Sequence, residues 1–142
     1  MKTTRSGMIE IFQSKEFATE IKRRAEKLKE KSTFEIGLVV EGQAKLLTPI
    51  KTGRLAGSIT TQSRTKGTKP DGEAFASDII QKPASDSEVF VGTPVDYAPY
   101  IEYGTRRSSA QPFLRPALNM ARGQVPKIVK NGAKFEFEGY KP

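Results

Sequence analysis

The chain has 142 residues, a length that fits one domain with a modest hydrophobic core. It contains no cysteine and no histidine, which excludes a disulfide scaffold and a thiolate zinc site and removes the usual general base of enzymes. The formal net charge of +8 favours contact with DNA or with an acidic protein surface, and the hydrophobic share of 36% fits either a protein with long polar loops or one that finishes burying its surface in an assembly.

Catalytic patterns are missing from the sequence. No glycine-rich phosphate loop precedes a helix start. Asp96 and Glu102 are six residues apart, so a helix would place them on different faces rather than as an acid/base pair. Ser108 and Ser109 have no histidine to activate them, which leaves a Ser–Lys arrangement as the alternative. We therefore expect no enzyme, no cofactor and no metal, and, without a membrane span or signal peptide, a soluble intracellular protein.

The first part of the chain predicts a leader and then helix. Residues 1–7 have nothing to bury and are expected to be disordered. In residues 8–12 apolar and polar side chains alternate weakly, so this segment could form a short edge strand. Ser14 is a suitable helix cap, and apolar residues then recur at helical spacing, at Phe17, Ile21 and Leu28.

A second helical pattern runs from Ser32 or Thr33 to Leu47. Pro49 ends it, because the residue before a proline is displaced from the helical region. One long bent helix over 14–47 is the open alternative.

The segment from Thr52 to Leu55 predicts a turn into a strand over 57–62. Gly53 supplies an unusual backbone angle and Leu55 packs inward, so turn chemistry explains both. Arg54 is left without a role, and Glu102 is its candidate partner. Residues 64–83 form a long loop, expected to be mobile, and a strand over 88–92 returns as the second arm of an antiparallel hairpin.

Three tyrosines, Tyr97, Tyr100 and Tyr103, follow at intervals of three and form one stripe on a short helix. Asp96 is its expected N-cap and Gly104 its expected terminator. A tyrosine has an apolar body and a polar tip, which suits a contact surface, although Tyr97 and Tyr100 could equally cover the sheet.

A basic loop over 105–111 comes next, with Arg106 and Arg107 in it and Arg115 shortly after. These cations either form a solvated surface or a ridge that faces DNA phosphates or an acidic partner. Aromatic residues do not alternate with them, as they do where single-stranded bases stack.

The last helix is expected from Pro112, with Phe113 on its apolar face and a kink or break near Gly123 and Pro126. Phe135 and Phe137 alternate with charge in a tail that could add an edge strand or dock on a neighbouring molecule. The sequence therefore predicts a single α+β domain over 1–142: N-terminal helices, a small antiparallel sheet with a long-looped hairpin, a short tyrosine-bearing helix and a C-terminal helix.

Two blocks carry a resemblance to a known family. The first is P-x-x-T-G-x-L-x-x-S-I, from Pro49 to Ile59. The second combines a V-G-T turn at 91–93, a Y-A-x-x-x-E-x-G-T run at 97–105 and P-F-L-x-P-A at 112–117. In this order they resemble the tail-completion, or head–tail joining, proteins of long-tailed double-stranded-DNA phages.

The resemblance implies a non-enzymatic virion protein that forms a ring, by family analogy of six subunits, and joins the tail tube to the head connector. DNA would pass through the ring as cargo. The expected contacts with neighbouring subunits are Tyr97, Tyr100, Tyr103, Phe113, Phe135 and Phe137. Arg106, Arg107 and Arg115 would face the DNA channel or an acidic partner, and the structural turn residues would be Thr52, Gly53, Arg54, Leu55, Glu102 and Gly104. A small sequence-independent DNA-binding protein is the main alternative, and a hydrolase is the third.

Overall fold

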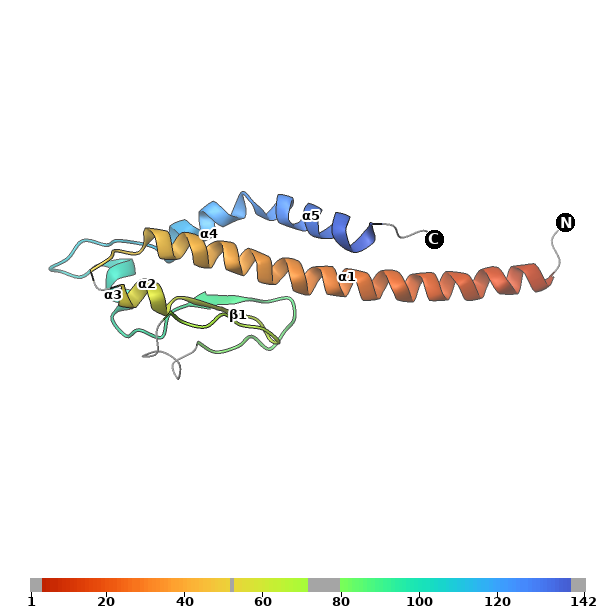
Figure 1. The fold of residues 1–142 in the computed structure, drawn as a ribbon, viewed down its shortest axis with the longest axis horizontal. Helices are drawn as coiled ribbons and strands as arrows, with labels where there is room; N and C mark the ends of the chain where they lie inside the picture. Colours follow the sequence, from red (N-terminus) through yellow and green to blue (C-terminus); the bar gives the residue numbers. More distant parts are fainter. Residues whose placement is uncertain (1–3, 52, 72–79, 139–142) are drawn as a thin grey trace.

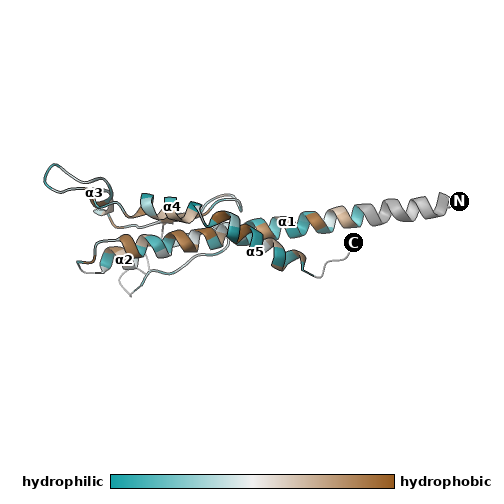
Figure 2. Ribbon diagram, turned by 90° about the horizontal axis from the view of Figure 1, so that it is seen from above, coloured by the Kyte–Doolittle hydropathy of each residue, from teal (hydrophilic) through white to brown (hydrophobic). Residues whose placement is uncertain are grey.

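The computed structural model describes residues 4–51, 53–71 and 80–138, with side chains from residue 15 onward. One long helix, α1 (Thr4–Leu47), forms the axis of the molecule. The helices α4 (Leu114–Arg122) and α5 (Val125–Phe137) lie along one side of α1, and the sheet with α2 and α3 lies on the other side (Figure 1). Hydrophobic and hydrophilic residues alternate along α1, α4 and α5 (Figure 2), as expected for helices that each bury one face.

α1 is a single helix of 44 residues, so the alternative of one helix over 14–47 is correct. Of the two residues that suggested a restart, Thr33 donates its hydroxyl to the carbonyl of Lys29 at 2.7 Å within the helix, and Ser32 is buried. The helix ends where Thr48, just before Pro49, donates its hydroxyl back to the carbonyl of Ala44 at 2.6 Å.

The N-terminal predictions differ from the structure. Residues 8–12 lie within α1, so the expected edge strand is wrong: a five-residue alternation is too short to outweigh continuation of the helix. Of the expected leader, residues 1–3 lie outside the described residues, and from Thr4 onward the chain is already helical.

The hairpin is shorter than predicted. Strands β1 (Thr60–Gln62) and β2 (Phe90–Gly92) pair antiparallel, with Thr61 opposite Val91, which confirms the hairpin. The residues expected to begin the first strand belong instead to the short helix α2 (Arg54–Ser58). Gly53 precedes α2 with φ of 73°, and its carbonyl accepts the N–H of Gly57 at 2.9 Å, so the turn continues into one helical turn before the strand begins.

The long loop is structured where it leaves β1. The N–H of Thr68 donates to the carbonyl of Thr61 at 2.9 Å, and Gly67 pairs with Gln62 in an isolated bridge. Buried Glu41 of α1 holds this return in place, because its carboxylate accepts the hydroxyls of Thr61 at 2.6 Å and Thr68 at 2.9 Å. Residues 72–79 lie outside the described residues, so the mobility expected for residues 64–83 stays a prediction.

The C-terminal part forms two helices with a break at Gly123 and Gln124, as predicted. The expected edge-strand tail is wrong, because Phe135 and Phe137 both lie in α5. α5 packs on α1, and Arg24 donates to the carbonyl of Glu136 at 2.6 Å, which supports the end of the helix.

The core lies where α1, α2, β1 and α4 meet. Its buried residues come from four separate segments of the chain: Val40, Ala44, Leu55, Ile59, Val95, Ala98, Phe113, Ala117 and Ala121. The alanines of α1 and α4 allow these two helices to approach closely, and Phe113 fills the space at the start of α4 with none of its surface exposed. This packing fixes the end of the molecule that carries α3.

Candidate functional site

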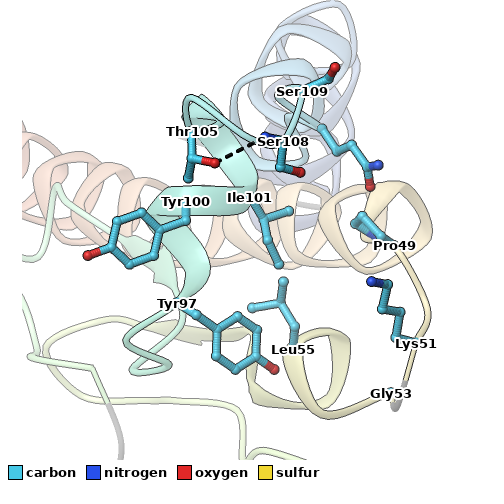
Figure 3. Close-up of a pocket in the computed structure, with 11 residues that line it drawn as sticks. Pro49, Lys51, Gly53, Leu55, Tyr97, Tyr100, Ile101, Thr105, Ser108 and Ser109 are labelled. Atoms are coloured by element: carbon cyan, nitrogen blue, oxygen red, sulfur yellow. Dashed lines mark hydrogen bonds between the residues drawn. The ribbon is translucent and has the colours of Figure 1, made fainter.

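The sequence-predicted turn residues and tyrosines gather at one end of the molecule, which we call the tyrosine end. It consists of the α1–α2 connection, α3 (Ala98–Tyr103) and the loop over 104–113 (Figure 1). Between these segments lies a groove of about 430 Å³. Figure 3 shows Leu55 and Ile101 pointing toward each other in it, with Tyr97 beside Leu55. The groove is lined by Pro49, Lys51, Gly53, Leu55, Tyr97, Tyr100, Ile101, Thr105, Ser108, Ser109 and Gln111.

One side of the groove is built by the first sequence block. Gly53 adopts the positive φ that the sequence predicted, and Leu55 is buried. Ser58 then joins the two blocks, because its hydroxyl lies 2.6 Å from that of Thr93 in the V-G-T turn. The two blocks therefore fold as one unit. Thr52 lies outside the described residues.

Glu102 has a role that the sequence did not predict: its carboxylate caps α4. It accepts the backbone N–H groups of Phe113 at 2.8 Å, Leu114 at 3.0 Å and Arg115 at 3.0 Å, three of the donors that a helix start leaves without intrahelical partners. Burial of this carboxyl opposes its ionisation, but the three N–H groups and the nearby Arg115 outweigh that, so the pKa of Glu102 lies below its usual range. The carboxylate proposed as a partner for Arg54 thus joins α3 to α4.

The opposite side of the groove is a tight turn. Gly104 ends α3 with φ of 77°, as predicted, and a Cβ there would come within 2.7 Å of the backbone nitrogen of Ala110. The hydroxyl of Thr105 accepts the N–H groups of Arg107 at 3.2 Å and Ser108 at 3.1 Å. This local bonding holds the exposed side chains of Arg106 and Arg107 on a defined turn.

The three tyrosines occupy different positions. Tyr97 is half-buried against the core and precedes α3 as its N-cap, without a side-chain capping bond, so the cap expected from Asp96 is wrong. Tyr100 and Tyr103 keep 64% and 62% of their surface exposed. Arg115 lies over the ring of Tyr103, with its guanidinium carbon 4.7 Å from the centroid. An exposed aromatic pair beside an apolar groove can bind a protein partner.

Three of the predicted contact residues are not exposed at the tyrosine end. Phe113 is fully buried, so it supports the fold and cannot contact a partner in this structure. Phe135 and Phe137 lie on α5 and are not part of the tyrosine end; Phe135 is 69% exposed, and the Lys31 Nζ stands 4.2 Å from its ring centroid. The structure thus brings Tyr97, Tyr100 and Tyr103 together with Arg106, Arg107 and Arg115, and places the two tail phenylalanines apart from them.

The part of the chain that the structure describes contains no group of three or more acidic side chains able to hold a metal ion. In the same residues, no helix is long and apolar enough to cross a membrane.

A family model described as "Bacteriophage HK97-gp10, putative tail-component" matches residues 13–104, which are 92 of the 142 residues. The chain belongs to the HK97-gp10-like family. It is therefore a member of a family of structural phage tail components rather than of an enzyme family. No curated protein and no solved structure gives a match.

The family match runs from α1 through α3 and ends at Gly104. In this HK97-gp10-like protein it includes the first sequence block, the V-G-T turn, the tyrosines and Glu102. The P-F-L-x-P-A block and the helices α4 and α5 lie beyond it, although the Glu102 cap ties them to the matched part.

Proposed function

We propose that this tail component is a ring-forming adaptor at the upper end of the tail or at the head–tail connection, where it completes the tail. The observation that carries the proposal is the tyrosine end. Two tyrosines there, Tyr100 and Tyr103, are more than 60% exposed, Tyr100 lines an apolar groove, and the backbone around them is held by local hydrogen bonds. Such a surface presents aromatic anchors at a small cost in conformational entropy.

A ring needs two different, complementary patches on each subunit. The tyrosine end is the first patch. The second is the region around Phe135 on α5, a ring that is 69% exposed and lies beside Lys31 of α1. These patches lie at separate places along the molecule, which suits head-to-tail contacts between copies. Six subunits are the expected number by family resemblance, and the tail tube and the head connector are the expected neighbours.

Lys51 lines the groove, and the exposed Arg106 and Arg107 lie on the turn between its lining residues Thr105 and Ser108. We infer that they meet an acidic partner surface or line the DNA channel, because exposed arginines without a nearby anion stabilise contacts of either kind. A channel through which DNA must pass quickly favours weak phosphate contacts, so we place the stronger contact on the acidic partner.

The test is the mass of the protein in solution as a function of concentration, followed by negative-stain imaging. Wild-type protein should form a larger, closed species as its concentration rises, and Tyr100→Ser with Tyr103→Ser should remain monomeric at the same concentrations. Met120→Ser is the matched control, since it removes a half-exposed apolar side chain from α4. A wild-type protein that stays monomeric at millimolar concentration and does not enter purified tails would refute the proposal.

A further inference from the structure

The positive charge of the chain is concentrated in its last third. Between Glu102 and Glu136 there are seven cationic residues and no acidic one. The rest of the chain holds the other 17 cationic residues and all 16 acidic ones, so its net charge is +1 out of the total of +8. The seven cations are Arg106, Arg107, Arg115, Arg122, Lys127, Lys130 and Lys134.

Four of these residues form what we call the cationic face: Arg122 at the end of α4 and Lys127, Lys130 and Lys134 on α5. The three lysines are spaced by three and four residues, so they lie on one side of α5. Half-buried residues of α5, among them Val125, Ile128, Gly132 and Glu136, lie on the opposite side, where α5 packs on α1, whereas the half-buried Phe137 lies nearer the lysines. The lysines consequently point away from the body of the protein.

The cationic face is open and not neutralised. All four side chains are exposed, and no ion pair in the described part of the chain involves any of them. The nearest acidic residue in sequence, Glu136, is half-buried and lies 3.9 Å from the Lys27 Nζ of α1. Figure 1 shows α4 and α5 end to end, with no other element on their outer side.

We propose that the cationic face binds the phosphate backbone of duplex DNA without reading its sequence. Between Arg122 and Lys134 the two helices extend about 18 Å at a rise of about 1.5 Å per residue. Over that length duplex DNA presents about ten phosphate charges. The spacing of the cations is thus comparable with that of the phosphates, and long lysine side chains contact phosphates rather than reading base edges.

Other anionic partners fit this face less well. A protein interface needs an apolar or aromatic centre and is depleted in lysine, whereas the residues beside the lysine stripe are Pro126 and Asn131. A membrane surface would need the apolar side of α5, which is already packed on α1. Single-stranded nucleic acid would need exposed aromatic rings among the cations, and Phe135 instead lies under Lys31.

The inference goes beyond the proposed function and does not depend on it. The cationic face lies outside the segment matched by the family model and apart from the tyrosine end. It can be measured on the isolated full-length chain, whether or not that chain forms rings.

The experiment measures the fluorescence anisotropy of a labelled 24-base-pair duplex of mixed sequence, titrated with the full-length protein at several salt concentrations. If all four cations contact phosphates, log K should fall with log salt with a slope of about −3.6. Lys127→Ala, Lys130→Ala and Lys134→Ala together should reduce the magnitude of that slope by about 2.7 and weaken binding about tenfold or more at 50 mM salt.

A matched control is available on α1. Lys15, Lys22 and Lys29 are also exposed and repeat every seven residues on one side of a helix, but acidic residues such as Glu16, Glu26 and Glu30 lie among them. Their triple alanine variant has the same net charge as the α5 variant and should keep the wild-type slope. Because all six lysines are exposed, both variants should keep the wild-type circular dichroism and melting temperature.

Three outcomes would overturn the inference. The first is wild-type protein that leaves the duplex unbound at 25 mM salt. The second is an equal loss of binding in the two triple variants, which would mean that net charge alone accounts for it. The third is an α5 variant that loses binding to an acidic peptide while its duplex binding is unchanged. The masses of both variants in solution separate this result from the adaptor proposal, since a ring that forms without duplex binding refutes only the inference about DNA.

Discussion

The tyrosine end and the cationic face present opposite chemistry on one rigid frame. The tyrosine end has a groove, exposed rings and a backbone fixed by Gly53, Gly104 and Thr105. The cationic face presents exposed lysines on a regular helix. The first suits a partner of defined shape, and the second suits a uniform polyanion. The comparison shows that the fixed positions of the two sequence blocks mainly build the fold, while the residues available for contact occupy their x positions, as Tyr100 and Tyr103 do, or lie outside the blocks.

The largest expected effect distinguishes a residue that stabilises the fold from a residue that contacts a partner, both within the tyrosine end. Phe113→Ala removes a fully buried ring and should lower the free energy of unfolding by about 3–5 kcal/mol. Tyr103→Ala removes a ring that is 62% exposed and should lower it by less than about 1 kcal/mol while weakening assembly. Urea denaturation of both variants checks this. If both variants lose the same free energy of unfolding, Tyr103 stabilises the fold as Phe113 does.

The second prediction concerns the strain at the turn that presents Arg106 and Arg107. Gly104→Ala places a Cβ at φ of 77° and within 2.7 Å of the Ala110 backbone, so it should lower the free energy of unfolding by about 1–3 kcal/mol. Gly123→Ala is the control, because Gly123 is helical and a Cβ there meets no atom closer than 3.7 Å. Thermal unfolding that is unchanged in the Gly104 variant would show that the loop relaxes without cost.

The third prediction tests the link between the two regions. Glu102→Gln keeps the shape of the cap and removes its charge, so it should cost about 1–2 kcal/mol at pH 7. Because the folded pKa of Glu102 is lowered, this stabilisation is present above the unfolded pKa of about 4.3 and is lost as the pH falls through the folded value. The stability difference between wild type and variant should therefore shrink below about pH 4.

The matched control for that series is Glu88→Gln, which changes an exposed carboxylate just before β2. Its free energy of unfolding should stay within about 0.5 kcal/mol of the wild type at every pH. A Glu102 variant whose deficit persists unchanged at pH 3 would indicate a steric effect rather than a charged cap.

The sequence predicted those features of the fold that depend on neighbouring residues. The positive φ at Gly53 and Gly104, the break at Gly123 and the antiparallel pairing of the hairpin all follow from local chemistry. Features that depend on distant contacts were missed. Glu102 meets N–H groups 11 to 13 residues further along, and no local pattern marks such a cap.

Short ambiguous patterns gave the remaining errors. The alternation of Phe135 and Phe137 fits a strand, but their segment forms the last turn of a helix held against α1. The run of cations after Glu102 is visible in the sequence, yet its outward direction follows only from which side of α5 packs on α1. The positive charge of the cationic face is thus visible in the composition, whereas its outward orientation follows from the packing of α5 on α1.

The smallest expected effect distinguishes the two cationic regions. Arg106→Ala with Arg107→Ala should leave the free energy of unfolding within about 0.5 kcal/mol of the wild type, since both side chains are exposed on a turn held by backbone and Thr105 bonds. The slope of log K against log salt for duplex binding should change by less than about 0.9, the value for one phosphate contact. Incorporation into tails should fall, because in our proposal these arginines face a partner at the tyrosine end. The measurement pairs duplex anisotropy with an assembly assay. The α5 triple variant is the control, because it should change the salt slope of duplex binding where the arginine variant does not.

One outcome would contradict this prediction. If the protein binds duplex DNA at submicromolar concentration in physiological salt and the double arginine variant abolishes that binding, DNA binding belongs to the loop, and the small DNA-binding protein is favoured over the adaptor.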